Sequence, residues 1–346
     1  MSAKKLKTAI LGLDEKARQL LKASQETNLF DICAVADSQD AALADQIAER
    51  LGCTAFDDYR QLVIQSQIDV LFVAEPLHVC QEYLYTAITK NINILKVIPP
   101  ALDFEQLAEF TRLARKNGVK FEVASNGQFL PGFSKLREYI QTQGVEGFQL
   151  ITAERNTPQE FDEDEVRWLS DPKLAGGGAL LRNCYELIGQ IVRNFGLPQQ
   201  VYSLNTNHAP DMQQRLSLTE DTAIVTMKFS DILFGNLIAN RIFGPERNSI
   251  QLYSSQKHIT VTENKLAISD NLGNVVEEFS GKTEANTATA KMLEKFAAGI
   301  LAPDKKDESS QENIDLEIMA MIESAYLSAR TAMPEEPARI LDRAGT

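Results

Sequence analysis

The sequence predicts an α/β protein of two domains: a doubly wound parallel sheet, followed by an α+β domain with a large, mostly antiparallel open sheet. Over residues 1–125, short apolar runs alternate with segments of helical spacing, a pattern typical of βαβ crossovers. Over residues 126–346, short apolar runs follow one another more directly, as they do in antiparallel sheets. A chain of 346 residues is long enough for two such domains.

In the first domain, each element follows from its apolar spacing and its stop signals. Strands are predicted where an apolar run meets a glycine, aspartate or proline, or leads out of a helix: 6–11, 30–36, 70–74, 92–97 and 120–124. Helices are predicted where apolar residues recur with helical spacing: 14–24, 41–51, 57–64, 79–89 and 104–116. Gly52 follows one of these helices at the position where a left-handed residue ends a helix.

In the second domain, strands dominate. They are predicted at 148–154, 200–206, 222–229, 233–241, 249–253 and 257–262. One helix is expected over 178–194, where Gly196 and Pro198 stop it, and a last helix over 314–331. The polar stretch 302–313 is expected to form a surface loop, and the tail after Pro334 to be poorly ordered.

The composition excludes several classes of protein. The net charge is −13 and no basic patch is visible, so a nucleic-acid partner is not expected. No apolar run reaches the roughly 20 residues that span a membrane, and the basic N-terminus has no signal-peptide core, which predicts a cytoplasmic protein. The four cysteines form no CxxC pair and the three histidines have no ligand spacing, so no metal site is expected.

The first strand–helix turn contains part of a dinucleotide fingerprint. A Rossmann-type site needs glycines for the tight turn, for the approach of the diphosphate and for helix packing. Gly12 provides the first and Ala17 is a tolerable third, but Asp14 stands at the second position. Its charge would repel a diphosphate by about 4 kcal/mol at 4 Å and an effective dielectric near 20. Alternatively, Asp14 is simply the N-cap of the helix that follows.

A second acidic residue stands at the end of the second strand. Asp37 occupies the place from which a carboxylate binds a ribose 2′-hydroxyl, which would favour NAD over NADP. The alternative is that Asp37 caps the residues that follow it, starting with Ser38.

Four later segments make the chain resemble the Gfo/Idh/MocA oxidoreductases over nearly its whole length. The family's Ala-Thr-Pro-Asn-x-x-His motif is similar here to Ala74-Glu75-Pro76-Leu77-His78-Val79-Cys80, which keeps the proline but has neither the asparagine nor the last histidine. Its Glu-Lys-Pro and Asn-x-Arg-Phe-x-Pro motifs are similar to Val97-Ile98-Pro99 and Asn126-Gly127-Gln128-Phe129-Leu130-Pro131, where the arginine is lost. Its glycine run before a helix is similar to Ala175-Gly176-Gly177-Gly178, which follows Trp168. The resemblance implies a Rossmann-type domain over 1–125 and a substrate and oligomerisation domain over 126–346. It also implies NAD(P) as the cofactor, bound around Gly12, Leu13, Asp37, Ser38, Pro76 and Pro99.

The positions that do the family's chemistry are replaced. Ile98 stands where the family has lysine, Arg182 where it has aspartate, and Glu186 where it has histidine. Lysine and histidine manage the proton that accompanies hydride transfer, and such work needs groups that titrate near the operating pH. Isoleucine cannot titrate, and arginine is always protonated. Arg182 and Glu186, four residues apart on one predicted helix, form either an ion pair that fills the vacated site or a new acid–base pair.

Two functions remain open, and with them the question whether the chain is an enzyme. The first is a catalytically inactive relative with a degenerate NAD(P) site and a binding, regulatory or partner role. The second is an active NAD(P)-dependent oxidoreductase with relocated proton chemistry. Such an enzyme would either resemble the biliverdin reductases, which are thought to protonate substrate through arginines, or act on a sugar-like substrate. Arg155, Arg167 and Arg182 are the candidate arginines for substrate protonation here.

The sequence also predicts a ligand class and a partner. With Ile98 apolar and Arg182 the fixed positive charge, the old substrate pocket would suit a small carboxylate or an amphipathic ligand. The apolar strands around 224–229 and 233–242 have helices available for one face only. The other face is expected to be covered in a homo-oligomer, or by an active relative.

Overall fold

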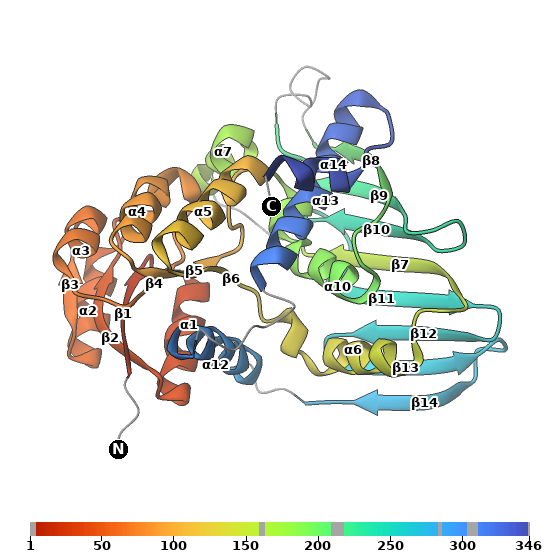
Figure 1. The fold of residues 1–346 in the computed structure, drawn as a ribbon, viewed down its shortest axis with the longest axis horizontal. Helices are drawn as coiled ribbons and strands as arrows, with labels where there is room; N and C mark the ends of the chain where they lie inside the picture. The colour runs from red at the N-terminus through yellow and green to blue at the C-terminus, as the bar shows by residue number, and fades with distance from the viewer. Residues whose placement is uncertain (1–4, 159–162, 209–217, 283–285, 303–310, 345–346) are drawn as a thin grey trace. The chain divides into compact units, whose positions relative to one another are not determined.

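The computed structural model describes residues 5–158, 163–208, 218–282, 286–302 and 311–344. The chain folds into two compact units (Figure 1). The first comprises Met1–Pro100, Gln106–Asn126 and Glu284–Glu312, and the second Ala101–Glu105, Gly127–Thr283 and Asn313–Thr346. This division differs from a single boundary after residue 125, because a segment from the second half of the sequence returns to the first unit.

The first unit is a six-stranded sheet in which each pair of neighbouring strands is parallel, with the order β3-β2-β1-β4-β5-β6. The strands are β1 (Leu6–Leu11), β2 (Phe30–Ala36), β3 (Thr54–Phe56), β4 (Val70–Val73), β5 (Asn93–Val97) and β6 (Phe121–Ala124). This is the doubly wound order of dinucleotide folds, in which ligands bind where the strand order reverses. That reversal lies between β1 and β4. The predicted fold of this half is confirmed, although β3 was not expected.

The helices of this unit are α1 (Glu15–Thr27), α2 (Ala41–Leu51), α3 (Tyr59–Gln65), α4 (Leu77–Thr89), α5 (Phe104–Asn117) and α12 (Thr287–Leu301). Gly52 ends α2 with φ 68°, the left-handed cap predicted from the sequence. Helix α12 was not predicted from the sequence; it packs against α1 beside the parallel sheet.

The second unit is built on an eight-stranded sheet with the order β14-β13-β12-β11-β7-β10-β9-β8. Its strands are β7 (Phe148–Asn156), β8 (Gln200–Thr206), β9 (Thr222–Lys228), β10 (Phe234–Asn240), β11 (Arg247–Ser254), β12 (Lys257–Thr262), β13 (Lys265–Asp270) and β14 (Val275–Ser280). Only β7 and β10 pair in parallel among these described strands, so the predicted mostly antiparallel sheet is confirmed. The last two strands were not predicted.

The helices of the second unit correct one prediction. They are α6 (Pro131–Gln143), α7 (Glu163–Ser170), α8 (Pro172–Ala175), α9 (Ala179–Arg182), α10 (Tyr185–Phe195), α13 (Gln311–Thr331) and α14 (Pro337–Leu341). The single helix expected over 178–194 is wrong, because α9 and α10 are separate. The N–H groups of Asn183 and Cys184 both donate to the carbonyl oxygen of Ala179, at 3.0 and 3.1 Å, so the helical hydrogen-bond register shifts there.

The C-terminal tail corrects another prediction, because residues 335–344 are ordered against the second unit. Glu335 pairs with Val201 through two backbone hydrogen bonds of 2.8 and 2.9 Å, and α14 buries Pro337 and Ile340. Two apolar side chains and a backbone bridge therefore hold a segment that was expected to be poorly ordered because it is terminal. Most of the predicted loop at 302–313 lies outside the described residues, and α13 already begins at Gln311.

One face of the eight-stranded sheet carries helices, and the other presents apolar side chains. Helix α6 packs on β12, β13 and β14, and α9 on β9 and β10 (Figure 1). On the opposite face, Leu204, Ile224 and Ile238 are direct cross-strand neighbours on β8, β9 and β10. Their exposed fractions are 60%, 46% and 38%, so they form a continuous apolar row in contact with solvent.

No helix in the described part of the chain is both long enough and apolar enough to cross a membrane.

Candidate functional site

The turn after β1 is tight, and Gly12 is needed there for two reasons. Its φ is +80°, in the region that favours glycine. A Cβ atom on Gly12 would also lie 2.9 Å from both Cγ and Oε1 of Glu75. The predicted role of Gly12 in making the tight turn is therefore confirmed. The side chain that faces Gly12 is the carboxylic acid of Glu75.

Asp14 is the N-cap of α1. Its Oδ1 accepts a hydrogen bond from the N–H of Ala17 at 2.8 Å, and its side chain stays exposed. The capping alternative is confirmed. One N–H of the helix end that would face a diphosphate is thus already engaged by a carboxylate.

Asp37 is buried and serves the backbone. Its Oδ2 accepts from the N–H of Leu13 at 2.8 Å, and its Oδ1 from the N–H groups of Gln39 and Asp40 at 2.8 and 2.9 Å. The contacts of Asp37 therefore confirm that it caps the residues that follow it, while its binding of a ribose stays a prediction. Leu13 directs its N–H toward Asp37 and is itself 2% exposed.

Glu75, which sequence reasoning did not single out, lies between these groups. Its side chain is 6% exposed and accepts a hydrogen bond at Oε1 from the hydroxyl of Tyr59. The N–H of Ser38 donates to the same hydroxyl at 2.8 Å. Burial raises the pKa of the Glu75 carboxyl, the Tyr59 hydrogen bond opposes that shift, and the charges of Asp37 and Asp14 add to it. The only sequence signal that could have identified Glu75 is that an acid stands where the family motif has threonine.

A buried lysine accompanies this carboxylate. Lys96 is 1% exposed on β5, and its ammonium donates to the carbonyl oxygen of Val97 at 2.8 Å. Its charge lowers the pKa of Glu75, less than burial raises it. A lysine inside an apolar strand run was the signal that could have identified it, because a buried charge requires partners.

The remaining cofactor positions lie at the ends of β4 and β5. Pro76 occupies the N-cap of α4 and makes no side-chain cap, and the half-buried Ile98 precedes the buried Pro99. The ammonium of Lys16 lies 3.5 Å from the carbonyl oxygen of Ile98. Whether any of these residues contacts a dinucleotide stays a prediction.

Taken together, the residues around Gly12 do not fit the diphosphate of a dinucleotide. Such a group needs a glycine-lined approach and available N–H donors. Here the space against Gly12 holds the Glu75 side chain, and the N–H groups of Leu13 and Ala17 are bound to Asp37 and Asp14. Gly12 and two of the N–H groups of this turn therefore already face carboxylates of the chain itself.

In the second unit, the glycine run before α9 is required by packing. Gly176 has φ +77°, and a Cβ there would lie 2.5 Å from the carbonyl oxygen of Leu102. A Cβ on Gly177 would lie 2.1 Å from the hydroxyl of Tyr326, and one on Gly178 1.8 Å from the backbone oxygen of Glu220. The glycines of the best-matching family motif are therefore required by close packing, independently of any catalytic role.

The side chain of Glu220 anchors the same turn. It is 6% exposed and accepts hydrogen bonds from the N–H groups of Gly178 and Leu180, at 2.9 and 2.8 Å, and from the hydroxyl of Tyr326 at 3.0 Å. Burial raises the pKa of this carboxyl, and the hydrogen bonds oppose the shift.

Arg182 and Glu186, the family's acid–base positions, each contact another part of the second unit. The guanidinium carbon of Arg182 lies 4.8 Å from the ring centre of Trp168, and Oε1 of Glu186 accepts from the N–H of Gly127 at 3.2 Å. Since the helix is interrupted between them, the regular i,i+4 geometry expected from the sequence is wrong. An ion pair or an acid–base pair between the two side chains stays a prediction. Cys184, between them, is fully buried, and burial raises its pKa, as expected of a core thiol.

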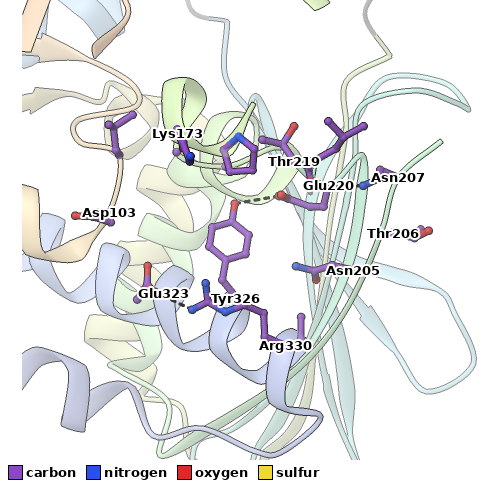
Figure 2. Close-up of a pocket in the computed structure, with 16 residues that line it drawn as sticks. Asp103, Lys173, Asn205, Thr206, Asn207, Thr219, Glu220, Glu323, Tyr326 and Arg330 are labelled. Atoms are coloured by element: carbon purple, nitrogen blue, oxygen red, sulfur yellow. Dashed lines mark hydrogen bonds and ion pairs between the residues drawn. The ribbon is translucent and has the colours of Figure 1, made fainter. Parts of the chain in front are cut away.

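A cavity of about 980 Å³ opens within the second unit, and Gly176 and Gly177 of the glycine turn are among its lining residues (Figure 2). Tyr326 and Arg330 project toward it from α13, where Tyr326 bonds to Glu220, and Asn205 lies on the opposing strand β8. Neither Arg182 nor any other acid–base position is among the described residues that line it. The ligand pocket predicted around Ile98 and Arg182 is therefore not this cavity.

The other candidate arginines differ in their surroundings. Arg155, 19% exposed in its side chain, lies 3.6 Å from a carboxylate oxygen of Glu246 and 3.9 Å from one of Glu263. Arg167 lies on α7 and is exposed. Within the described ranges, no three histidine, cysteine, aspartate or glutamate side chains are grouped so that they could hold a metal ion.

Comparison with known proteins supports the resemblance read from the sequence. Residues 6–125 match the model of the oxidoreductase family with an NAD-binding Rossmann fold, Gfo/Idh/MocA. A trans-1,2-dihydrobenzene-1,2-diol dehydrogenase of Xenopus laevis is 26% identical over 166 residues, 47% of this chain and 49% of that protein. The match thus spans about half the length of such curated relatives.

Solved structures share the fold of the whole chain. An oxidoreductase of Thermotoga maritima superposes with a TM-score of 0.81 at 19% identity, covering 97% of this chain and all of that one (100%). A levoglucosan dehydrogenase in complex with NADH and levoglucosan gives 0.82 at 15% identity, with 96% and 99% covered. At these identities the likeness establishes the two-domain fold.

Proposed function

We propose that this chain, whose Rossmann unit belongs to the Gfo/Idh/MocA oxidoreductase family, is a catalytically inactive relative with a binding, regulatory or partner role. One observation carries the proposal: Asp14, Asp37 and Glu75 surround the turn where a diphosphate would bind. An NAD(P)-dependent reaction requires the cofactor to bind, and these carboxylates oppose it by occupying both space and N–H donors.

The acid–base positions support the same function. Ile98 has no proton to give, and the guanidinium of Arg182 stays charged at every physiological pH. The side chain of Glu186 accepts a hydrogen bond from the backbone N–H of Gly127. A general acid or base should titrate near the operating pH, and none of the three side-chain types has a reference pKa there.

Calorimetric titration with NAD⁺, NADH, NADP⁺ and NADPH tests the proposal. We expect no dissociation constant below about 1 mM, because repulsion of about 4 kcal/mol removes a typical micromolar affinity. Micromolar binding of any of the four forms would overturn the inactive reading.

The second candidate, an active NAD(P)-dependent oxidoreductase with proton chemistry on arginines, has one observation in its favour. Nη1 of Arg155 is buried and makes no hydrogen bond within the described residues, so its proton is not committed to an acceptor. Its partners Glu246 and Glu263 lie at ion-pair distances only. Tight NADH binding together with loss of turnover in Arg155→Lys would favour this candidate.

A partner role has a surface available to it. The apolar row of Leu204, Ile224 and Ile238 matches the central, desolvated part of a protein interface. We therefore propose a homo-oligomer, or a pair with an active relative, through this face of the sheet. A cytoplasmic location is part of the proposal, because all four cysteines are free thiols, as in a reducing compartment.

A further inference from the structure

We propose that Glu75 is the residue that closes the dinucleotide site, ahead of Asp14, so that the chain's own carboxylate stands where a cofactor phosphate or ribose would lie. This inference rests on the proposed function, since it names the group responsible for the loss of cofactor binding. The sequence alone pointed to Asp14. The geometry points to an acid that is 61 positions further along the chain and meets the same turn in space.

The position of Glu75 is the first argument. It follows β4, and Gly12 follows β1, so the two residues face each other at the reversal of strand order. Ligands of doubly wound sheets bind in this crevice, and Gly12, the first glycine of the fingerprint, makes the tight turn at its edge. A Cβ on Gly12 would meet Cγ and Oε1 of Glu75 at 2.9 Å. A ligand group that enters the crevice beside this turn would meet the same two atoms.

The fixation of the side chain is the second argument. Glu75 cannot turn out of the way without breaking the hydrogen bond from Tyr59, which comes from α3 and is itself buried. That tyrosine also accepts the N–H of Ser38 at 2.8 Å, so the pair is tied to the loop after β2. A buried hydroxyl that loses its partner costs more than an exposed one, because water does not replace the bond.

The charge balance is the third argument. Asp37 and Asp14 both act on the Glu75 carboxyl, and Lys96 supplies one positive charge against three negative ones. Asp14 is exposed, so solvent and salt screen it, whereas Glu75 is buried and screened less. A diphosphate would therefore add further negative charge at a carboxylate that is screened less than Asp14.

The decisive experiment replaces Glu75 and measures binding of two probes. Glu75→Thr introduces the residue type of the family motif, and Glu75→Ala is the second variant should the first fail to fold. NADH is one probe, and ADP-ribose, which contains the adenosine, diphosphate and ribose without nicotinamide, is the other. Asp14→Gly is measured in parallel. Glu49→Thr is the matched control, because it removes one negative charge from an exposed site on α2.

We expect Glu75→Thr or Glu75→Ala to tighten the binding of both probes at least tenfold over the wild type, and more than Asp14→Gly does. Glu49→Thr should leave both affinities unchanged. The inference is overturned if folded Glu75 variants bind as weakly as the wild type, or if Asp14→Gly alone produces the gain; the proposed inactive function survives either result. Micromolar binding by the wild type would overturn both.

Discussion

Removing the buried carboxylate of Glu220 should destabilise the turn that leads to Arg182. In Glu220→Ala, the N–H groups of Gly178 and Leu180 and the hydroxyl of Tyr326 lose their acceptor. All three groups lie next to a side chain that is 6% exposed, so water has little access to replace the bonds. At about 1–3 kcal/mol for each of the three buried groups left without a partner, the loss is roughly 3–9 kcal/mol.

Two milder variants each remove only part of this hydrogen bonding. Glu220→Gln keeps the volume and one carbonyl oxygen, but its amide N–H₂ must face one of two donating N–H groups, so we expect a loss of about 1–3 kcal/mol. Tyr326→Phe removes a single hydrogen bond and should cost about 1 kcal/mol. The order Ala, Gln, Phe in decreasing effect is therefore the expected series.

The pH dependence has a definite sign. Burial raises the pKa of the Glu220 carboxyl above its ordinary value of 4.5, so the folded protein binds this proton more tightly than the unfolded chain. The free energy of unfolding should then fall as the pH rises from the ordinary pKa of the carboxyl through its raised pKa. Glu220→Gln removes one such group, so its stability should decline less steeply over this range.

Urea denaturation followed by circular dichroism, at a series of pH values, measures both effects. The reasoning would be refuted if Glu220→Ala unfolded within 1 kcal/mol of the wild type, estimated with the same m-value. A Glu220→Gln variant with a steeper pH dependence than the wild type would contradict the assigned sign.

Three further outcomes are expected. Ile224→Asp should dissociate the homo-oligomer proposed through the open sheet face, and light scattering that shows a monomeric wild type at all concentrations would contradict that interface. Trp168 is the only tryptophan, so Arg182→Ala should change the intrinsic fluorescence by removing the guanidinium 4.8 Å from its ring. In thermal-shift screens, the same variant should abolish any stabilisation of the protein by small carboxylates. Cys184 should not react with a thiol reagent in the native protein, because it is buried and its pKa is raised; rapid labelling at this position by mass spectrometry would refute that.

The secondary structure was most predictable where local signals agree. The bounds of β1, β2, β8, β12 and α2 match those predicted from apolar runs and their stop residues. The capping roles of Asp14 and Gly52 were also readable, because a cap depends on residues only a few positions away. The family motifs survive for a related reason: glycines that meet backbone atoms at less than 3 Å leave no room for a side chain.

Other features required the folded chain. The break between α9 and α10 arises from a local shift in hydrogen-bond register that the apolar spacing does not encode. The order of the tail depends on Val201, far away in sequence, which pairs with Glu335. Helix α12 joins the first unit because its apolar face packs on α1, and spacing alone does not say which unit a helix will cover.

The proposed closure of the dinucleotide site shows most clearly which features could be predicted from the sequence and which required the fold. By itself, the sequence determined that a Rossmann-type sheet is present, that its first glycine is kept, and that Ile98, Arg182 and Glu186 replace the family's proton-transfer groups. Only the tertiary structure decided that Glu75 fills the space in front of Gly12, where Tyr59 holds it. Parallel strands bring their carboxyl ends to one edge of the sheet, so residues far apart in sequence meet there, and no local pattern reports which side chains come into contact.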